Sequence, residues 1–599
     1  MASFISETSN YLFVWIILFY VITNVVVFFF KNPEEHKHFY AFQFIIAILF
    51  HAVGYITLFM RSEDLKYFFF FAFQEIIIIA IVMIYLTIYP SISRLLLNNM
   101  IFLLDVSFII LGRLAFENAL RQFSITIVLL IVSLFVPVIY IKNKGWRNVP
   151  YLYCTVGIIS LAAVWITGSV THGSKLNIEI WGFNFQPSEF VKISIIFFMA
   201  ALLSQKKNKL KYVLCTMFML VHVMILVLSK DLGSAGIYLI TYIFMIFLAS
   251  RSPLILPAGA ALSVGAFTFA YKEFAHVRVR VHTWLNPFED VENTGWQLSQ
   301  SLFAIGTGGW FGMGLLQGYP KSIPYVEEDF IFSAIGEEMG VLFSVLLILL
   351  YLFTALHIIR YSYHVKSDFH RLLLYGFAVC FAVQVFVTIG GGTRLIPLTG
   401  VTLPLISMGG SSLCTTVLMF SIIQGIYVKE FDYKNLSKEV VEEEELDEDF
   451  DDEVDEDEEY EEENEEYDEV NEEYIEETQE KDEVNEEYND SETAEPDEPS
   501  YQTVSSSNES EGLTREFAKE EIQAIRSVTD EIHEMHTEDK EDPFKDDIYE
   551  PEDTYEPADD EESVYIDEPD NNIDSEEEKT FGAYGTSYDE MINDFNFED

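Results

Sequence analysis

The chain has 599 residues, 50% of them hydrophobic, and a formal net charge of −58. Residues 441–599 hold 70 of the 94 Asp and Glu and 7 of the 36 Lys and Arg, so residues 1–440 carry 24 acids and 29 bases, a net charge of +5. The acidic balance therefore describes only the C-terminal part and says nothing about the partners of residues 1–440. We expect no nucleic-acid partner.

Apolar runs of about 20 residues, the length that a helix needs to cross a bilayer, follow one another from residue 11 to residue 428. The first run has no basic flank before it and no small-residue cleavage site after it, so we expect it to remain as a span. We predict an all-α polytopic membrane protein with about thirteen spans. The predicted spans are 11–30, 39–60, 68–90, 99–117, 122–142, 149–169, 186–204, 211–229, 233–250, 252–271, 331–359, 370–391 and 404–428.

Basic residues predict the orientation of these spans, because cytoplasmic loops are enriched in Lys and Arg. Clusters lie in alternate loops, at 142–147, 206–211, Arg251 and 360–371, and all four fall on one side. The N-terminus and the long loop 272–330 then lie outside, and the acidic tail lies in the cytoplasm.

The two ends of the chain differ in composition from its centre. The three spans before residue 95 contain a mid-span Glu75, which we expect to face a protein or watery interior. We expect this bundle to dock against the centre or a partner, and its removal to preserve the intrinsic chemistry. Residues 433–599 are so acidic that we predict a mostly disordered tail. Within it, 514–536 has helical apolar spacing, which fits either folding on a cytoplasmic partner or a marginal isolated helix.

Two polar interruptions lie on the external side. In 172–192, Gln186-Pro187 can end a re-entrant stretch and start a helix. Glu189 and Lys192 then share a helix face, either as a functional pair or as one that neutralises itself. Lys230 and Asp231 interrupt an apolar hairpin, where buried charge requires compensation.

Later in the chain, Arg278 and Arg280 alternate with valines, so they point to one side if the stretch is extended. Arginine suits phosphate oxygens, although interfacial snorkelling explains the pattern equally well. Residues 388–413, with Arg394 and Ser407, contain glycines and prolines that break a helix. Broken helix at membrane depth is tolerated where it is buried in protein or lines a cavity.

Residues 295–340 are rich in glycine and include Glu327, Glu328 and Asp329 directly before an apolar run. A carboxylate cluster at this boundary fits a catalytic site in a watery cavity or a solvated loop beside a helix start.

Five segments together resemble one family, in its order: FQPSE at 185–189, DLGSA at 231–235, GWQLSQSLFAIGTGGWFGMGL at 295–315, EDFIFSAIGEEMG at 328–340 and IPLTGVTLPLISMGGSSL at 396–413. The chain is identified as a member of the FtsW/RodA/SpoVE (SEDS) family. The resemblance implies a ten-span SEDS core at 96–432, preceded by an extra bundle of about three spans at 1–95 and followed by the acidic tail at 433–599. Glu328 stands where the family usually has Thr.

The resemblance also implies a function. The family polymerises peptidoglycan from lipid II at the outer face of the bacterial cytoplasmic membrane, in division, elongation or sporulation, with a class B penicillin-binding protein. Divisome or elongation proteins are further partners expected for the tail. The family's catalytic acid maps onto Asp329, to which we assign the role of general base. We expect pyrophosphate binding by Lys192, Arg278, Arg280 and Arg394, and supporting roles for Glu189, Lys230, Asp231, Glu338 and Ser407.

Pyrophosphate often brings a divalent cation, but the sequence has no dedicated metal motif and predicts no certain cofactor. Two other functions fit the broken helices and intramembrane charge: a flippase for lipid-linked precursors and a catalytically silent scaffold. A polymerase lengthens glycan from lipid II, a flippase moves it without making polymer, and a scaffold is insensitive to substitution of Asp329.

Overall fold

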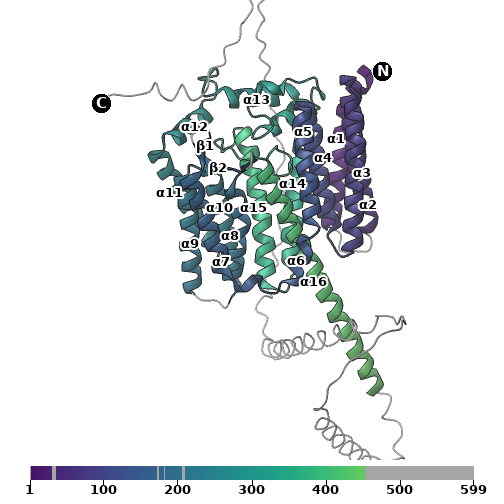
Figure 1. Ribbon diagram of the computed structural model, residues 1–599, viewed down its shortest axis with the longest axis vertical. Helices are drawn as coiled ribbons and strands as arrows, with labels where there is room; N and C mark the ends of the chain where they lie inside the picture. The colour runs from purple at the N-terminus through teal and green to yellow at the C-terminus, as the bar shows by residue number, and fades with distance from the viewer. Residues whose placement is uncertain (1, 30–35, 172–173, 181–182, 206–208, 452–599) are drawn as a thin grey trace, which may run out of the picture. The chain divides into compact units, whose positions relative to one another are not determined.

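A computed structural model describes residues 2–29, 36–171, 174–180, 183–205 and 209–451. Over these residues the chain is almost entirely helical (Figure 1). The helices are α1 (Ala2–Phe29), α2 (His36–Ser62), α3 (Leu65–Ile88), α4 (Arg94–Leu114), α5 (Phe116–Ser133), α6 (Val136–Lys142), α7 (Pro150–Thr167), α8 (Pro187–Leu203), α9 (Lys209–Leu228), α10 (Leu232–Ser250), α11 (Ile255–Glu273), α12 (Ala275–Leu285), α13 (Trp296–Gly308), α14 (Ile331–Ser362), α15 (Asp368–Gly392) and α16 (Gly410–Asp451), with short 3₁₀ turns at Trp146–Asn148 and Pro320–Ser322.

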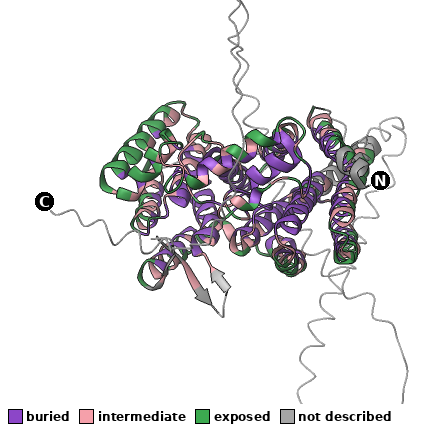
Figure 2. Cartoon of the chain, turned by 90° about the horizontal axis from the view of Figure 1, so that it is seen from above, coloured by how far each residue is buried: buried purple, intermediate pink, exposed green. Residues whose placement is uncertain are grey.

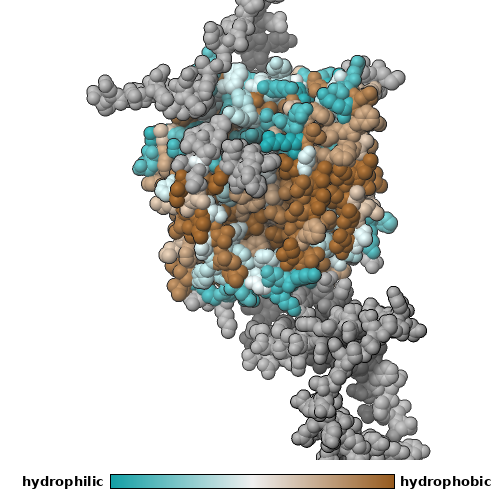
Figure 3. Space-filling model, viewed as in Figure 1, coloured by the Kyte–Doolittle hydropathy of each residue, from teal (hydrophilic) through white to brown (hydrophobic). Residues whose placement is uncertain are grey.

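The helix lengths support a multi-pass membrane protein. Among the described residues, eleven helical stretches are long and apolar enough to cross a membrane, with α5 and α6 forming one of them. The other two predicted spans, 149–169 and 186–204, coincide with the shorter helices α7 and α8. The space-filling view shows an apolar belt around the middle of the helices and polar residues toward both of their ends (Figure 3).

The helices differ in how far they are buried. α4 is buried from Leu95 to Leu114 and lies inside the bundle, where its polar side chains Asn99, Asp105 and Arg113 meet protein partners. α9 and α11 are largely exposed, and Figure 2 shows such exposed faces at the periphery around a buried centre. Because lipid covers exposed apolar faces in a membrane, these peripheral helices need no protein cover there.

Helices α1, α2 and α3 pack against the helices that follow them, α1 on α14 and α2 on α4. The sequence predicts that this bundle docks against the centre of the chain or against a partner. Glu75 on α3 is buried, which confirms that it faces a protein interior. Its Oε1 lies 2.9 Å from Nδ1 of His51 on α2, and Asp105 Oδ1 on α4 lies 3.7 Å from the same nitrogen. This cluster joins the N-terminal helices to α4 with polar groups inside the apolar layer.

Two sequence expectations about local structure are wrong. Residues around 169–185 form short antiparallel strands, β1 (Ser169–Thr171), β2 (Ser174–Ile180) and β3 (Phe183–Phe185), in place of a re-entrant stretch. The arginines at 278 and 280 lie on helix α12, so they do not share the single side of an extended segment.

α16 continues to Asp451, so the first residues of the tail, 433–451, are helical. The expectation of a mostly disordered tail concerns mainly residues beyond 451, and it stays a prediction. A helix already formed at 410–431 removes the nucleation cost for the Glu-rich residues that follow, and Glu favours helix. The rest of the tail, including 514–536, lies outside the described residues.

Candidate functional site

Asp329 lies in the loop directly before α14, and its side chain is partly exposed. Another broken segment fixes this loop: the Met408 amide donates to the Glu327 carbonyl at 2.8 Å, and the Ser407 hydroxyl donates to the Glu328 carbonyl. Ser407 also accepts from the Leu403 amide at 2.9 Å. Ser407 therefore holds the backbone that carries the carboxylate, which agrees with a supporting role.

Two more segments meet beside Asp329. Gly400 has a φ of +72°, and a Cβ there would lie 3.5 Å from Asp329 Oδ2. Glycine adopts this backbone conformation without strain and leaves space beside the carboxylate. Arg280 Nη1 on α12 points to the same turn, at 3.3 Å from the Leu398 carbonyl and 3.4 Å from the Thr399 carbonyl.

The surroundings of Asp329 change its acidity. Burial raises the pKa of the Asp329 carboxyl from 3.8 to about 7, the neighbouring Glu328 raises that pKa as well, and Arg280 lowers it. A carboxylate with a pKa near the working pH is suited to take a proton during a reaction. This group therefore has the acidity of a general base at neutral pH.

The other two predicted external cations, Arg278 and Arg394, lie in the same region and, like Arg280, donate to backbone carbonyls. Arg278 is exposed and donates from Nη1 to the Lys272 carbonyl at 2.7 Å. Arg394, with a φ of +62°, donates to the carbonyls of Trp284 at 2.9 Å and Leu285 at 2.6 Å. Arg394 thus caps the C-terminal end of α12, where a cation is favourable. It also borders an open depression of about 310 Å³ that is lined by residues 285–289.

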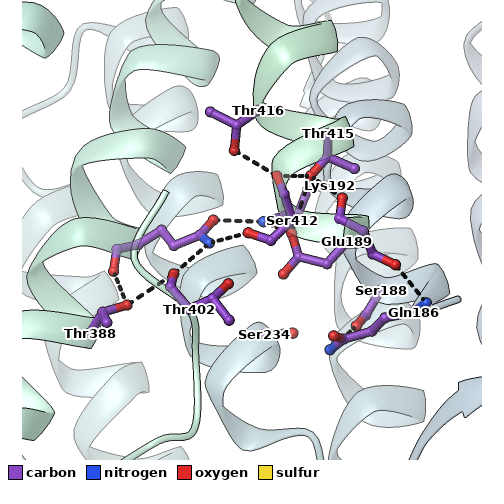
Figure 4. Close-up of polar contacts among 12 residues, drawn as sticks. Gln186, Ser188, Glu189, Lys192, Ser234, Thr388, Thr402, Ser412, Thr415 and Thr416 are labelled. Carbon is purple, nitrogen blue, oxygen red and sulfur yellow. Dashed lines mark hydrogen bonds and ion pairs between the residues drawn. The ribbon is translucent and has the colours of Figure 1, made fainter. Parts of the chain in front are cut away.

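Lys192 lies elsewhere, in a buried polar network between α8, α15 and α16 (Figure 4). Its ammonium donates to Glu189 Oε2 and to Gln384 Oε1, both at 2.6 Å. Glu189 Oε2 also accepts from the Thr415 hydroxyl at 3.2 Å, and Gln384 Nε2 donates to the Thr402 carbonyl at 3.1 Å. The network connects through Thr402 to the segment that contains Gly400.

Asp231 and Lys230 separate although they are adjacent in sequence. Asp231 is buried and caps α10, accepting from the Ser234 amide at 3.1 Å and the Ser188 hydroxyl at 2.9 Å. Lys230 is exposed and has a φ of +60°. Asp231 thus connects the start of α10 to the start of α8 through Ser188, the residue before Glu189.

Glu338 belongs to a third polar group. Arg113 Nε on α4 donates to Glu338 Oε1 at 2.5 Å, and Arg113 Nη2 donates to the Gly318 carbonyl at 2.7 Å. Both charged side chains are buried. Glu338 therefore helps to hold the glycine-rich loop onto α14 and sits apart from the contacts around Asp329.

Sequence reasoning missed several residues that build these groups: Arg113, Gln384, Gly400 and Thr402. Gln384 and Arg113 stand inside or at the end of apolar spans, and polar residues there usually face the protein interior. That signal identifies them as buried, but their charged partners, Lys192 and Glu338, lie more than 180 residues away in the chain. These pairs can be found only from the fold.

The described part of the chain contains no group of three His, Cys, Asp or Glu side chains that could hold a metal ion. A divalent cation here would need most of its ligands from substrate or water, since magnesium usually keeps substrate phosphates and waters. No step below is routed through a metal.

Comparison with known proteins bears on the identity of the fold. The family model FtsW/RodA/SpoVE, described as cell cycle protein, matches residues 91–431. The chain belongs to this family. The matched residues include the contacts around Asp329, the network of Lys192 and the pair of Arg113 and Glu338. Helices α1, α2 and α3 precede the matched residues.

Relatives of the SEDS chain include glycosyltransferases. This chain is 35% identical over 274 residues to "Peptidoglycan glycosyltransferase RodA" of Mycobacterium bovis, and the match covers 43% of this chain and 58% of that protein. It is 34% identical over 296 residues to "Probable peptidoglycan glycosyltransferase FtsW" of Geobacter sulfurreducens, covering 48% of this chain and 79% of the relative. A chain from the solved structure of a peptidoglycan synthase complex is 24% identical with a TM-score of 0.49, covering 56% of this chain and 97% of that chain.

Proposed function

We propose that this SEDS protein is a peptidoglycan glycosyltransferase that polymerises lipid II, the disaccharide-pentapeptide carried on undecaprenyl pyrophosphate. The observation that carries the proposal is the Asp329 carboxylate, with its pKa near 7, beside the exposed Arg280. Family membership and the names of the relatives support the same reaction class.

The proposed reaction needs one base. Asp329 takes the proton from the acceptor sugar hydroxyl as its oxygen bonds to the anomeric carbon of the donor. The bond from that carbon to the pyrophosphate oxygen breaks, and undecaprenyl pyrophosphate leaves as an anion. Because this leaving group departs unprotonated, the reaction does not need the second carboxylate that glycoside hydrolases use as acid.

We assign the leaving group to the cations of α12. Arg280 and Arg278 are exposed, and a guanidinium matches phosphate oxygens. Lys192 is buried and donates to two protein side chains, and Arg394 uses both Nε and Nη2 to hold the end of α12. We therefore propose that these two residues position segments, together with Glu189, Asp231, Glu338 and Ser407. The backbone bonds of Arg278 and Arg280 are made from Nη1. Lys230 is exposed just before α10, and we keep it as a candidate for a supporting role.

We place the reaction outside the cytoplasmic membrane, with the N-terminus outside and the C-terminal tail inside, on the distribution of basic loops. A class B penicillin-binding protein is the proposed partner, because a cross-linking enzyme must act on the strand that this one makes.

The decisive experiment is polymerisation of lipid II by the purified full-length protein, with and without its class B synthase. Asp329→Asn keeps the shape of the side chain and removes the base, so polymer formation should fall about a hundredfold to ten-thousandfold. Near-normal polymerisation by this variant would show that the assignment is wrong.

Two controls separate loss of chemistry from loss of structure. Glu328→Thr changes the adjacent exposed carboxylate to the residue usual in the family and should remain active. Asp329→Asn should unfold no earlier than the parent at pH 8, because the folded protein binds the Asp329 proton more tightly than the unfolded chain, and the charged form is therefore unfavourable for folding above pH 7.

The same preparation tests the flippase alternative. Reconstituted vesicles that translocate lipid II with no polymer formed would favour transport, whereas polymer without translocation favours the enzyme. Indifference of cells to Asp329→Asn would favour a silent scaffold.

A further inference from the structure

The N-terminal helices precede residues 91–431, which match the family, yet they contact the loop that leads to Asp329. Asn10 Nδ2 on α1 donates to the Gly312 carbonyl at 3.0 Å. Arg61 Nη1, in the last turn of α2, donates to the Leu315 carbonyl. Two helices outside the matched residues therefore bind the backbone of one short loop within them.

The fit at Gly314, between these two contacts, is tight. Gly314 has a φ of +102°, and a Cβ there would lie 2.9 Å from Asn10 Oδ1 and 3.1 Å from Arg61 Nη2. Beside it, the rings of Tyr11 and Phe311 lie 4.8 Å apart. The loop thus closes against α1 and α2 with no room for a side chain at its centre.

The same loop is bonded to α14. The amides of Met313 and Gly314 donate to the carbonyls of Glu337 and Glu338 at 2.9 and 2.8 Å. In return, the Val341 amide donates to the Gly309 carbonyl at 2.9 Å. These bonds cross the kink of α14 at Gly340, whose φ is +90°, and they satisfy backbone groups that the kink removes from the helix.

α1 is also fixed to α14 deeper in the apolar layer. Asn99 on α4 donates to Asn24 Oδ1 at 2.8 Å and to the Thr354 hydroxyl at 2.9 Å, and it accepts from the Tyr20 hydroxyl at 3.1 Å. Buried polar bonds of this kind define one register between helices, because a shift leaves the groups unsatisfied. α1 therefore approaches the loop from a fixed position.

We propose that Asn10 and Arg61 are positioning residues, and that α1 and α2 form a support within the chain that holds the loop 309–315 and the start of α14 for the reaction at Asp329. This inference rests on the proposed function. It revises the expectation that residues 1–95 can be removed without effect on the chemistry, because their removal would take two side-chain contacts from the loop 309–315, which is bonded to α14.

The test uses the full-length protein with Asn10→Ala, Arg61→Gln and the double variant. Loss of the support displaces the base without touching groups that bind substrate, so kcat should fall between about tenfold and a hundredfold while KM changes little. Arg61→Lys, which keeps a donor at this position, should recover part of the rate. Lys66→Ala, which removes an exposed cation five residues farther along, is the matched control and should leave kcat unchanged.

Hydrogen exchange supplies a readout that does not depend on activity. The amides of residues 309–315 should exchange faster in the Asn10 and Arg61 variants and in Gly314→Ala, which crowds the same contact from the loop side. Unchanged exchange, or unchanged kcat in variants with the parent's unfolding temperature, would overturn the proposal. If the parent itself makes no polymer, the proposed function fails, and the exchange experiment still decides whether the support exists.

Discussion

Two centres of charge in this protein differ in how their surroundings treat a carboxylate. Glu189 is buried and bonded to Lys192, which also bonds to Gln384. Asp329 is partly exposed beside a glycine, with a pKa raised to about 7. The first carboxylate is fully compensated, and the second is held in surroundings that disfavour its charge.

This difference separates stability from chemistry. A compensated ion pair inside an apolar layer joins helices, and its ammonium is already occupied, so it is poorly placed to bind a substrate. A carboxylate held near neutral pKa costs folding free energy but can exchange a proton with a bound sugar. We therefore expect substitutions at Glu189 and Lys192 to lower the unfolding temperature, and substitutions around Asp329 to lower the reaction rate.

The largest effect is expected at Lys192. Lys192→Met leaves Glu189 buried without its cation, and loss of one partner of a buried pair costs about 3 to 5 kcal/mol. The unfolding temperature in detergent should fall clearly below that of the parent. The double variant Glu189→Gln, Lys192→Met removes both charges and should recover most of the loss; a double variant as unstable as the single one would contradict the proposed pairing.

The next effect is expected at Arg280. Arg280→Gln removes a cation from the proposed pyrophosphate site, and a bond to a charged group contributes about 1.5 to 3 kcal/mol, so the rate should fall roughly tenfold to a hundredfold. Arg280 also lowers the pKa of Asp329, so the rising limb of the kcat profile should move to higher pH. Arg280→Lys should keep the profile near that of the parent. A lower rate with an unchanged pH profile would show that Arg280 does not influence the acidity of Asp329.

A smaller effect is expected at Gly400. Gly400→Ala adds a methyl 3.5 Å from Asp329 Oδ2 and places a non-glycine residue at a φ of +72°. The strain is about 1 kcal/mol, too little to unfold the protein, while the methyl occupies space beside the base. Polymerisation should fall severalfold with little change in unfolding temperature. Full activity would show that the space beside Oδ2 is not used.

The smallest effect is a shift of pH dependence at Glu328. Because Glu328 raises the pKa of Asp329, Glu328→Gln should move the rising limb of kcat to lower pH. Activity at pH 8 should remain close to that of the parent, since Asp329 is deprotonated in both proteins there. A shift in the opposite direction would mean that a different group controls the profile.

Much of the fold follows from hydropathy along the chain. Each of the thirteen predicted spans overlaps helix, with 122–142 divided between α5 and α6, and eleven helical stretches are long and apolar enough to cross a membrane. This agreement arises because a run of about 20 apolar residues is a local property of the sequence. The errors arose where local pattern is ambiguous. Arg278 and Arg280 alternate with valines in a segment that fits a short helix as well as a strand.

The sequence by itself determined the apolar spans, the uneven charge and the motifs that mark Asp329. Only the tertiary structure decided which charges are compensated: Lys192 turned inward to Gln384, 192 residues away, and Arg113 paired with Glu338 across 225 residues. The same holds for Asn10, which reaches Gly312 across 302 residues. Hydropathy is set within one turn or span of the chain, whereas the partner of a polar side chain inside a membrane protein depends on which helices pack together.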